Sequence, residues 1–137
     1  LLPIIKLSFF IPLFGSGSTK LQPVFVEDVV DGVEVILKED IKGNNIYELT
    51  GSEIFTYKSL YQLIIKYLGL KRIFVPIPFV IAKIIVSVAE KTPFNLLTKD
   101  QLLLFKENST SSNQSKSFKD LGISPKNIRD IFNKIII

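Results

Sequence analysis

The stretch QPVFVEDVV, residues 22–30, passes from strand-forming residues to a helix start within nine positions. Pro23 has no N–H to donate and therefore fits the start or the edge of a strand, and the three residues after it favour extended backbone. Asp28 can cap a helix in which apolar residues recur at helical spacing, namely Val29, Val30, Val33, Ile36 and Leu37. We predict a strand over 22–26 that leads directly into this helix.

The alternation of strand and helix continues on both sides of this stretch. Apolar runs predict a buried segment at Phe9–Phe14 and strands at Ile46–Thr50 and Arg72–Pro76. Helices are predicted to begin at capping residues or prolines, namely Thr56, Pro78, Thr98 and Ser124. With about three strands and five helices, the chain is too small to cover a parallel sheet on both faces. We therefore expect part of an α/β fold, with a few short parallel strands plus a small helical lobe.

Composition excludes several classes of protein. The chain has 137 residues, which is enough for one domain at most. It contains no Cys and no His, which excludes disulfides, thiolate metal sites and histidine acid–base chemistry. It also contains no Met, so we expect a piece of a longer reading frame.

Charge is distributed unevenly along the chain. Residues 1–54 carry a net charge of −4, and residues 55–137 carry +8. Such asymmetry can mark an anionic partner, either a nucleic acid or a membrane surface. However, fifteen of the seventeen basic residues are Lys, which also suits an ordinary solvated surface. With only two Arg and no nucleic-acid motif, we expect no nucleic-acid partner.

The predicted helix over 79–91 is apolar around most of its circumference. No apolar run approaches the length of about 20 residues that a membrane-spanning helix needs. One interpretation buries this helix inside its own protein. The other offers a face to a partner or a lipid surface, with Lys71, Arg72 and Lys91 as basic flanks. The residues of this partner or membrane face are Phe79, Ile81, Ile84, Ile85 and Val88.

No motif predicts catalysis or metal binding by this chain. The run GSGSTK at Gly15–Lys20 departs from the dinucleotide pattern, which needs Gly at position 20, and from the P-loop spacing. A solvent-facing turn is the simpler interpretation. No Tyr-x-x-x-Lys pair is present either. We assign no catalytic residue and no metal ligand, and expect no catalysis from this chain alone.

Several short motifs in order nevertheless resemble a known family. They are similar to the extended short-chain dehydrogenase/reductase family and its NAD-dependent epimerase/dehydratase members. Within it, they look most like the nucleotide-binding accessory subunits of respiratory complex I (NADH:ubiquinone oxidoreductase) and their bacterial relatives. The motifs are FIPLFGSG (10–17), QPVFVEDV (22–29), YELTG (47–51), Thr56, Leu60, VPIPF (75–79), LTKDQLLL (97–104) and DLGI (120–123).

The resemblance implies the C-terminal portion of a Rossmann-like fold. Residues 1–54 would hold the last strands and helix of the sheet, and residues 55–137 a mainly helical substrate or interaction lobe. The Gly-rich loop for NAD(P)(H) and the Tyr-x-x-x-Lys pair would lie in an upstream Rossmann half. By resemblance, the candidate substrate-lobe residues are Gly15, Gly17, Gln22 and Phe25. Gln22 stands where sugar-nucleotide enzymes often have an Arg, which disfavours that substrate.

The resemblance leaves three functions open. The first is a non-catalytic lobe that acts in assembly or stability of the complex I peripheral arm, with peripheral-arm subunits and the upstream half as partners. The second is the substrate lobe of an NAD(P)-dependent sugar-nucleotide epimerase/dehydratase or reductase. The third is a truncated or split reading frame whose product does not fold alone. We expect a cytoplasmic location, with peripheral contact at the inner respiratory membrane as a further expectation, and no cofactor on this chain alone.

Overall fold

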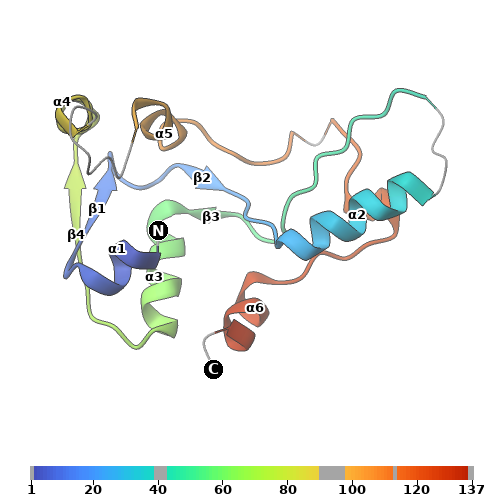
Figure 1. The fold of residues 1–137 in the computed structure, drawn as a ribbon, viewed down its shortest axis with the longest axis horizontal. Helices are drawn as coiled ribbons and strands as arrows, with labels where there is room; N and C mark the ends of the chain where they lie inside the picture. Colours follow the sequence, from blue (N-terminus) through green and yellow to red (C-terminus); the bar gives the residue numbers. More distant parts are fainter. Residues whose placement is uncertain (1, 39–42, 90–97, 113, 136–137) are drawn as a thin grey trace. The chain divides into compact units, whose positions relative to one another are not determined.

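The computed structural model describes residues 2–38, 43–89, 98–112 and 114–135. Their fold is mixed α/β with a small parallel sheet, a partial Rossmann-like arrangement that confirms the predicted fold class (Figure 1). The elements in chain order are α1 (Leu2–Leu7), β1 (Phe10–Phe14), β2 (Lys20–Leu21), α2 (Val26–Lys38), β3 (Phe55–Thr56), α3 (Tyr57–Tyr67), β4 (Ile73–Ile77), α4 (Phe79–Ala89), α5 (Lys99–Leu104), the 3-10 helix η1 (Phe118–Leu121) and α6 (Ile128–Ile135).

The chain divides into two compact units. Unit 1 comprises Leu1–Lys20 and Thr56–Ser109, and unit 2 comprises Leu21–Phe55 and Thr110–Ile137. The chain passes from unit 2 back to unit 1 between Phe55 and Thr56. The domain boundary predicted from the sequence lies one residue earlier, between residues 54 and 55. Each unit combines segments from both predicted domains, and the functional division into a sheet part and a lobe stays a prediction.

Unit 1 is built on the parallel pair β1 and β4. Phe10 is in register with Ile73 and Phe14 with Ile77, and the two arrows run side by side in Figure 1. Ile11 and Leu13 are buried, whereas Phe10 is 56% exposed. Successive strand residues point to opposite faces, so only every second side chain of this run reaches the core. The expectation that the whole run is buried was wrong for this reason.

Capping residues set the helix starts of unit 1, as predicted. The Thr56 hydroxyl accepts a hydrogen bond from the Ser59 N–H at 3.0 Å, and the Thr56 N–H donates to Ser59 Oγ at 2.9 Å. Thr98 and Gln101 form the same reciprocal pair at the start of α5. Such boxes satisfy backbone N–H groups that a helix start leaves unpaired. Gly69, just after α3, has left-handed backbone with φ 64°.

Unit 2 is built around the contact of α2 with η1. A Cβ on Gly32 would lie 3.1 Å from the Phe118 ring and 3.2 Å from a Leu49 methyl, so α2 approaches closely only because this position is Gly. Phe118 and Leu121 are both buried. The 3-10 helix that presents them is capped by Ser117 and Asp120, and the sequence pattern did not predict it.

Two predicted strands are absent from the described residues. The segment 22–25 has no strand partner, and α2 begins at Val26, before the predicted cap. The segment 46–50 forms a single parallel bridge, from Tyr47 to Lys116. Both segments have β-forming residues, but a strand exists only where a neighbouring strand completes its ladder.

The last helix also begins later than predicted, at Ile128 instead of Pro125. The Lys126 N–H donates to the Asp28 carboxylate, so this residue joins α2 rather than the first turn of α6. The Asn127 carbonyl accepts from the Ile131 N–H and starts the helical pattern. A long-range hydrogen bond therefore displaced a local start signal.

Replacement of Gly15 by Ala is expected to destabilise unit 1. Gly15 has φ 65°, and an added Cβ would lie 2.6 Å from the Phe79 ring. Gly69→Ala is the matched control, because Gly69 has φ 64° and open space around it. Left-handed backbone alone costs an L-residue about 1–2 kcal/mol, so Gly15→Ala should cost clearly more than that. Urea denaturation of both variants measures the difference, and equal losses would contradict the contact with Phe79.

Candidate interaction surface

The two predicted glycines hold a turn of unit 1 together. The Gly15 N–H donates to the Ile77 carbonyl at 2.8 Å, and the Lys58 N–H donates to the Gly17 carbonyl at 3.1 Å. Gly17 also has positive φ, at 68°. These bonds connect the end of β1 to β4 and to the start of α3. Structural use of the glycines accounts for their pattern without a ligand.

Gln22 is occupied at both ends of its amide. Its Nε2 donates to the Gly51 carbonyl at 2.7 Å, and its Oε1 accepts from the Ser111 N–H at 3.2 Å. The Phe25 ring lies 5.0 Å from the ammonium of Lys126. Gln22 and Phe25 therefore make internal contacts in unit 2, while Gly15 and Gly17 belong to unit 1.

The side of α4 that the sequence singled out is largely bare. Ala82 and Val86 are buried against Leu102 of α5. The opposite side exposes between 50% and 73% of each of five apolar residues. We call this set the α4 face: Val80, Ile81, Ile84, Ile85 and Val88. Contiguous exposed apolar surfaces are typical of sites that contact another protein or a membrane.

Phe79 differs from the other residues predicted for this face. It is partly buried, packs against the cluster of Ala82, Val86 and Leu102, and contacts Gly15. The ammonium of Lys106 lies 5.5 Å from its ring centroid. Phe79 therefore anchors the first turn of α4 to unit 1, and Val80 takes its place on the bare side.

Positive charge accompanies the α4 face. Unit 1 holds ten basic residues against three acidic ones, whereas unit 2 holds seven against ten. Of the predicted basic flanks, Arg72 is used internally, because its guanidinium donates to the Ile5 and Lys6 carbonyls at 2.8 and 3.0 Å. Lys71 and Lys83 are exposed, and Lys91 lies outside the described residues.

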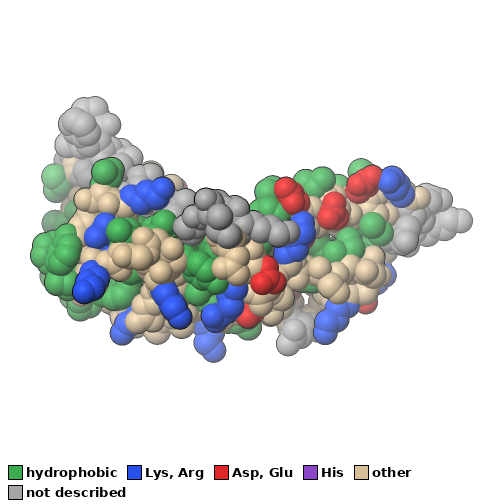
Figure 2. Space-filling view, turned by 90° about the horizontal axis from the view of Figure 1, so that it is seen from below, with side chains coloured by type: hydrophobic (Ala, Val, Ile, Leu, Met, Phe, Trp, Pro, Cys, Tyr) green, Lys and Arg blue, Asp and Glu red, His purple; other side chains and the backbone are tan. Residues whose placement is uncertain are grey.

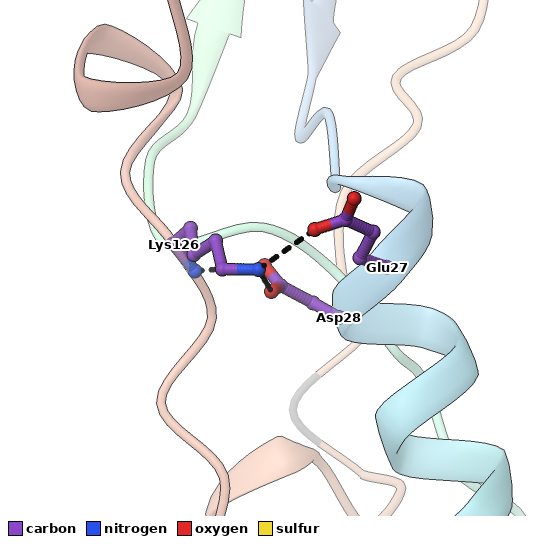
Figure 3. A network of polar contacts seen from close by, with 3 residues as sticks. All are labelled: Glu27, Asp28 and Lys126. Atoms are coloured by element: carbon purple, nitrogen blue, oxygen red, sulfur yellow. Dashed lines mark hydrogen bonds and ion pairs between the residues drawn. The ribbon is translucent and has the colours of Figure 1, made fainter. Parts of the chain in front are cut away.

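Asp28 is the buried charged side chain among the described residues of unit 2 (Figure 3). Its carboxylate is buried, accepts from the Lys126 N–H at 2.7 Å and lies 3.4 Å from the Lys126 ammonium. Glu27 reaches the same ammonium at 3.2 Å. The bond to Glu27, helped by Asp28, raises the pKa of Lys126 against an opposing effect of desolvation.

The sequence could not distinguish this role of Asp28 from helix capping. A carboxylate near a helix start is a common local preference, and its partner lies 98 residues further along the chain. The network holds the segment before α6 against α2. Its groups are all paired with one another, so they serve packing rather than acid–base chemistry.

The described residues also lack two other kinds of site. Within ranges 2–38, 43–89, 98–112 and 114–135, no helix is long and apolar enough to span a bilayer. The same ranges contain no group of three or more acidic side chains arranged to hold a metal ion.

A parallel β1–β4 sheet with a bare apolar helix beside it defines a partial Rossmann-like α/β protein. Comparison with curated proteins identifies homologues. The chain is 31% identical to NADH dehydrogenase [ubiquinone] 1 alpha subcomplex subunit 9, mitochondrial, of Arabidopsis thaliana over 130 residues, covering 88% of this chain and 32% of the relative. It is 28% identical to the NADH-ubiquinone oxidoreductase 40 kDa subunit, mitochondrial, of Neurospora crassa over 110 residues, covering 80% and 29%.

The predicted resemblance to subunits of NADH:ubiquinone oxidoreductase is confirmed by these matches. No protein-family model matches the chain. The chain spans about a third of the length of the curated relatives it matches. What the whole relatives bind, and where they assemble, therefore transfers to this chain only as a proposal.

Loss of the Asp28 carboxylate is expected to destabilise unit 2. Asp28→Ala leaves the part-buried Lys126 N–H without its acceptor, which costs about 1–3 kcal/mol. Asp28→Asn should cost less, because its amide oxygen can still accept that hydrogen bond. Urea denaturation measures both variants, with Lys126→Met as a control that keeps the backbone N–H. Equal losses for Ala and Asn would contradict the role of the buried acceptor.

Proposed function

We propose that this chain is the non-catalytic C-terminal lobe of a complex I accessory protein, acting in assembly or stability of the peripheral arm. The observation that supports this most is the similarity, over 88% of the chain, to a subunit of NADH dehydrogenase. Peripheral-arm subunits and an upstream Rossmann half are the proposed partners.

The position of Gln22 disfavours the alternative of a sugar-nucleotide enzyme. A substrate-reading side chain must have polar atoms available for the ligand, but both ends of the Gln22 amide are bonded within unit 2. Phe25 is likewise covered by Lys126. These contacts support a structural use of the residues that would line a substrate lobe.

Any NAD(P)(H) is proposed to bind the upstream half and not this chain. The two glycines that resemble a nucleotide loop direct their backbone bonds to Ile77 and Lys58. The GSGSTK run leads into the two-residue strand β2, which begins at its last residue, Lys20, whereas a phosphate loop requires a helix there. A nucleotide would therefore contribute to the stability of the longer protein, and it is not proposed to react on this chain.

The α4 face is proposed to rest on an anionic lipid surface, which makes the protein peripheral on the respiratory membrane. An interfacial helix needs a bare apolar side to enter the headgroup region and cations to meet anionic lipids. The α4 face provides the first, and the excess of ten basic over three acidic residues in unit 1 provides the second. Surface cations such as Lys83 and Lys106 add attraction without a specific site.

The accessory role predicts that the protein migrates with complex I. The chromosomal gene is tagged at its 3′ end, and membranes solubilised in mild detergent are separated by native electrophoresis. The tagged protein should co-migrate with NADH dehydrogenase activity, and its deletion should lower the amount of assembled enzyme. Migration as a free protein, with unchanged complex I after deletion, would contradict the proposal.

The lipid proposal predicts selective binding to anionic vesicles. The chain should float with vesicles of phosphatidylcholine and cardiolipin, and less with phosphatidylcholine alone. Ile84→Asp should lower the bound fraction roughly tenfold, because removing one large buried apolar side chain costs on the order of 1.5–3 kcal/mol. Leu37→Asp, at an apolar residue of the acidic unit 2 that is even more exposed than Ile84, is the control. Equal loss in both variants, or none in Ile84→Asp, would contradict the role of the α4 face.

A further inference from the structure

One face of the β1–β4 sheet is covered only where its strands end. Strand alternation and the parallel register place six side chains on this face, namely Phe10, Pro12, Phe14, Ile73, Val75 and Ile77. Where the strands end, Phe14 and Ile77 pack against the cluster that joins α4 to α5. Where the strands begin, Phe10, Ile73 and Val75 are 56%, 49% and 39% exposed. We call this bare part the β1–β4 patch: Phe10, Pro12, Ile73 and Val75.

Both edges of this sheet disfavour the addition of a further strand. In the parallel register, the backbone groups of Pro12 and Pro76 point away from the partner strand, and neither proline has an N–H to donate. The Phe10 N–H donates to the Ser8 hydroxyl at 3.3 Å, and the same hydroxyl donates to the Phe10 carbonyl at 2.6 Å. A partner of the β1–β4 patch should therefore pack on its face and not extend its ladder.

A helix is the element that suits such a face. The same face already carries one where the strands end, because Ala82 and Val86 of α4 belong to the cluster that Phe14 and Ile77 contact. Helices that cover a sheet lie beside one another in a single layer. A second helix beside α4 would continue this layer over the β1–β4 patch, and the exposure of Phe10 shows that the described residues provide none.

Positive charge surrounds the patch. Residues 1–20 and 56–89 contain no Asp or Glu. The Arg72 guanidinium donates to the carbonyls of Lys6 and Lys71, each at 3.0 Å, so these two exposed lysines lie where β4 begins. Figure 2 shows Lys and Arg side chains among apolar ones at the left end of the view, with no acidic side chain there. This charge would repel a second copy of unit 1 and attract acidic side chains.

A lipid surface is a poorer occupant than a helix. The outward carbonyls of a two-stranded sheet, such as those of Pro12 and Pro76, would lose their water in hydrocarbon. Helix α4 bonds its own backbone and meets no such cost, so the argument for lipid at the α4 face does not extend to the sheet. A partner helix covers the side chains of a sheet and leaves the edge carbonyls in water.

We propose that the β1–β4 patch binds an amphipathic helix of another protein, whose apolar stripe is flanked by Asp and Glu. The stripe would cover Phe10, Ile73 and Val75. The acidic flank would meet Lys6 and Lys71. The inference rests on the proposed function, because it assigns to a peripheral-arm partner a surface on strands that is separate from the α4 face.

Designed peptides provide the test. Three fluorescent peptides of about 18 residues, roughly five helical turns, carry a Leu stripe flanked by Glu, the same stripe flanked by Lys, or the residues of the first in scrambled order. In anisotropy titrations, the Glu-flanked peptide should bind the chain at least tenfold more tightly than the other two. Phe10→Asp should lower its affinity roughly tenfold, because an apolar contact is lost and a like charge is added.

Lys71→Glu is the second variant, and it keeps the test decisive if Phe10→Asp does not fold. Because Lys71 is exposed, the change should leave the fold intact, weaken the Glu-flanked peptide and strengthen the Lys-flanked one. Ile84→Asp on the α4 face and Leu37→Asp in unit 2 are matched controls at exposed apolar residues. Both should leave the affinity for the Glu-flanked peptide unchanged.

Several results would overturn the proposal. Equal affinities for the three peptides would remove the acidic helix as the occupant, and an equal loss in Ile84→Asp would assign the peptide to the α4 face. Vesicle flotation that depends on Phe10 more than on Ile84 would assign the patch to lipid. A dimer that Phe10→Asp dissociates would assign it to a second copy. Loss of binding in a chimera with the upstream part of the Arabidopsis relative would assign it to that part.

The peptide titration does not involve complex I. Its failure is therefore distinguishable from a failure of the co-migration test, which addresses the proposed function.

Discussion

The parallel pairing of β1 with β4 is the constraint on which the rest of the fold depends. Parallel strands cannot be joined by a tight turn, so the chain between Phe14 and Ile73 must leave at one end of the sheet and return at the other. This connection has two parts. Residues 21–55 provide the first part of unit 2, and α3 then returns the chain to β4. The hydrogen bond from Gly15 to Ile77 closes the far end of the pair.

The crossover also explains why helices α2 and α4 are each covered on one side only. A pair of short strands offers little surface for a helix to pack on. Helix α4 therefore packs through Phe79, Ala82 and Val86 against Leu102 of α5, and the α4 face stays exposed. Unit 2 has a single parallel bridge and no sheet of its own among the described residues. Helix α2 therefore packs on η1 through the side that carries Gly32. Its other side leaves four apolar residues exposed, namely Val26, Val30, Val33 and Leu37. The two bare surfaces differ in charge, which points to different partners for the two units.

Local signals predicted much of this arrangement correctly. The caps at Thr56 and Thr98 and the helical regions of α2, α3 and α4 all follow from residues within one or two turns of each other. The short strand preferences at 22–26 and 46–50 were not sufficient, because β-forming residues need a partner strand. The bare α4 face was one of the two interpretations of that helix. Phe79 differs from the rest of this face, because its ring contacts Gly15, and local spacing does not predict that contact.

The sequence alone determined the α/β class, the helix starts that have capping boxes and the absence of Cys and His chemistry, since these depend on residue type and near neighbours. It also carried the motif order that relates the chain to complex I subunits. Only the tertiary structure decided the partner of Asp28, the occupation of Gln22 and which side of α2 is buried. Each of these depends on contacts between residues far apart in the sequence, such as Asp28 with Lys126, 98 positions away. Local sequence patterns carry no information about such contacts.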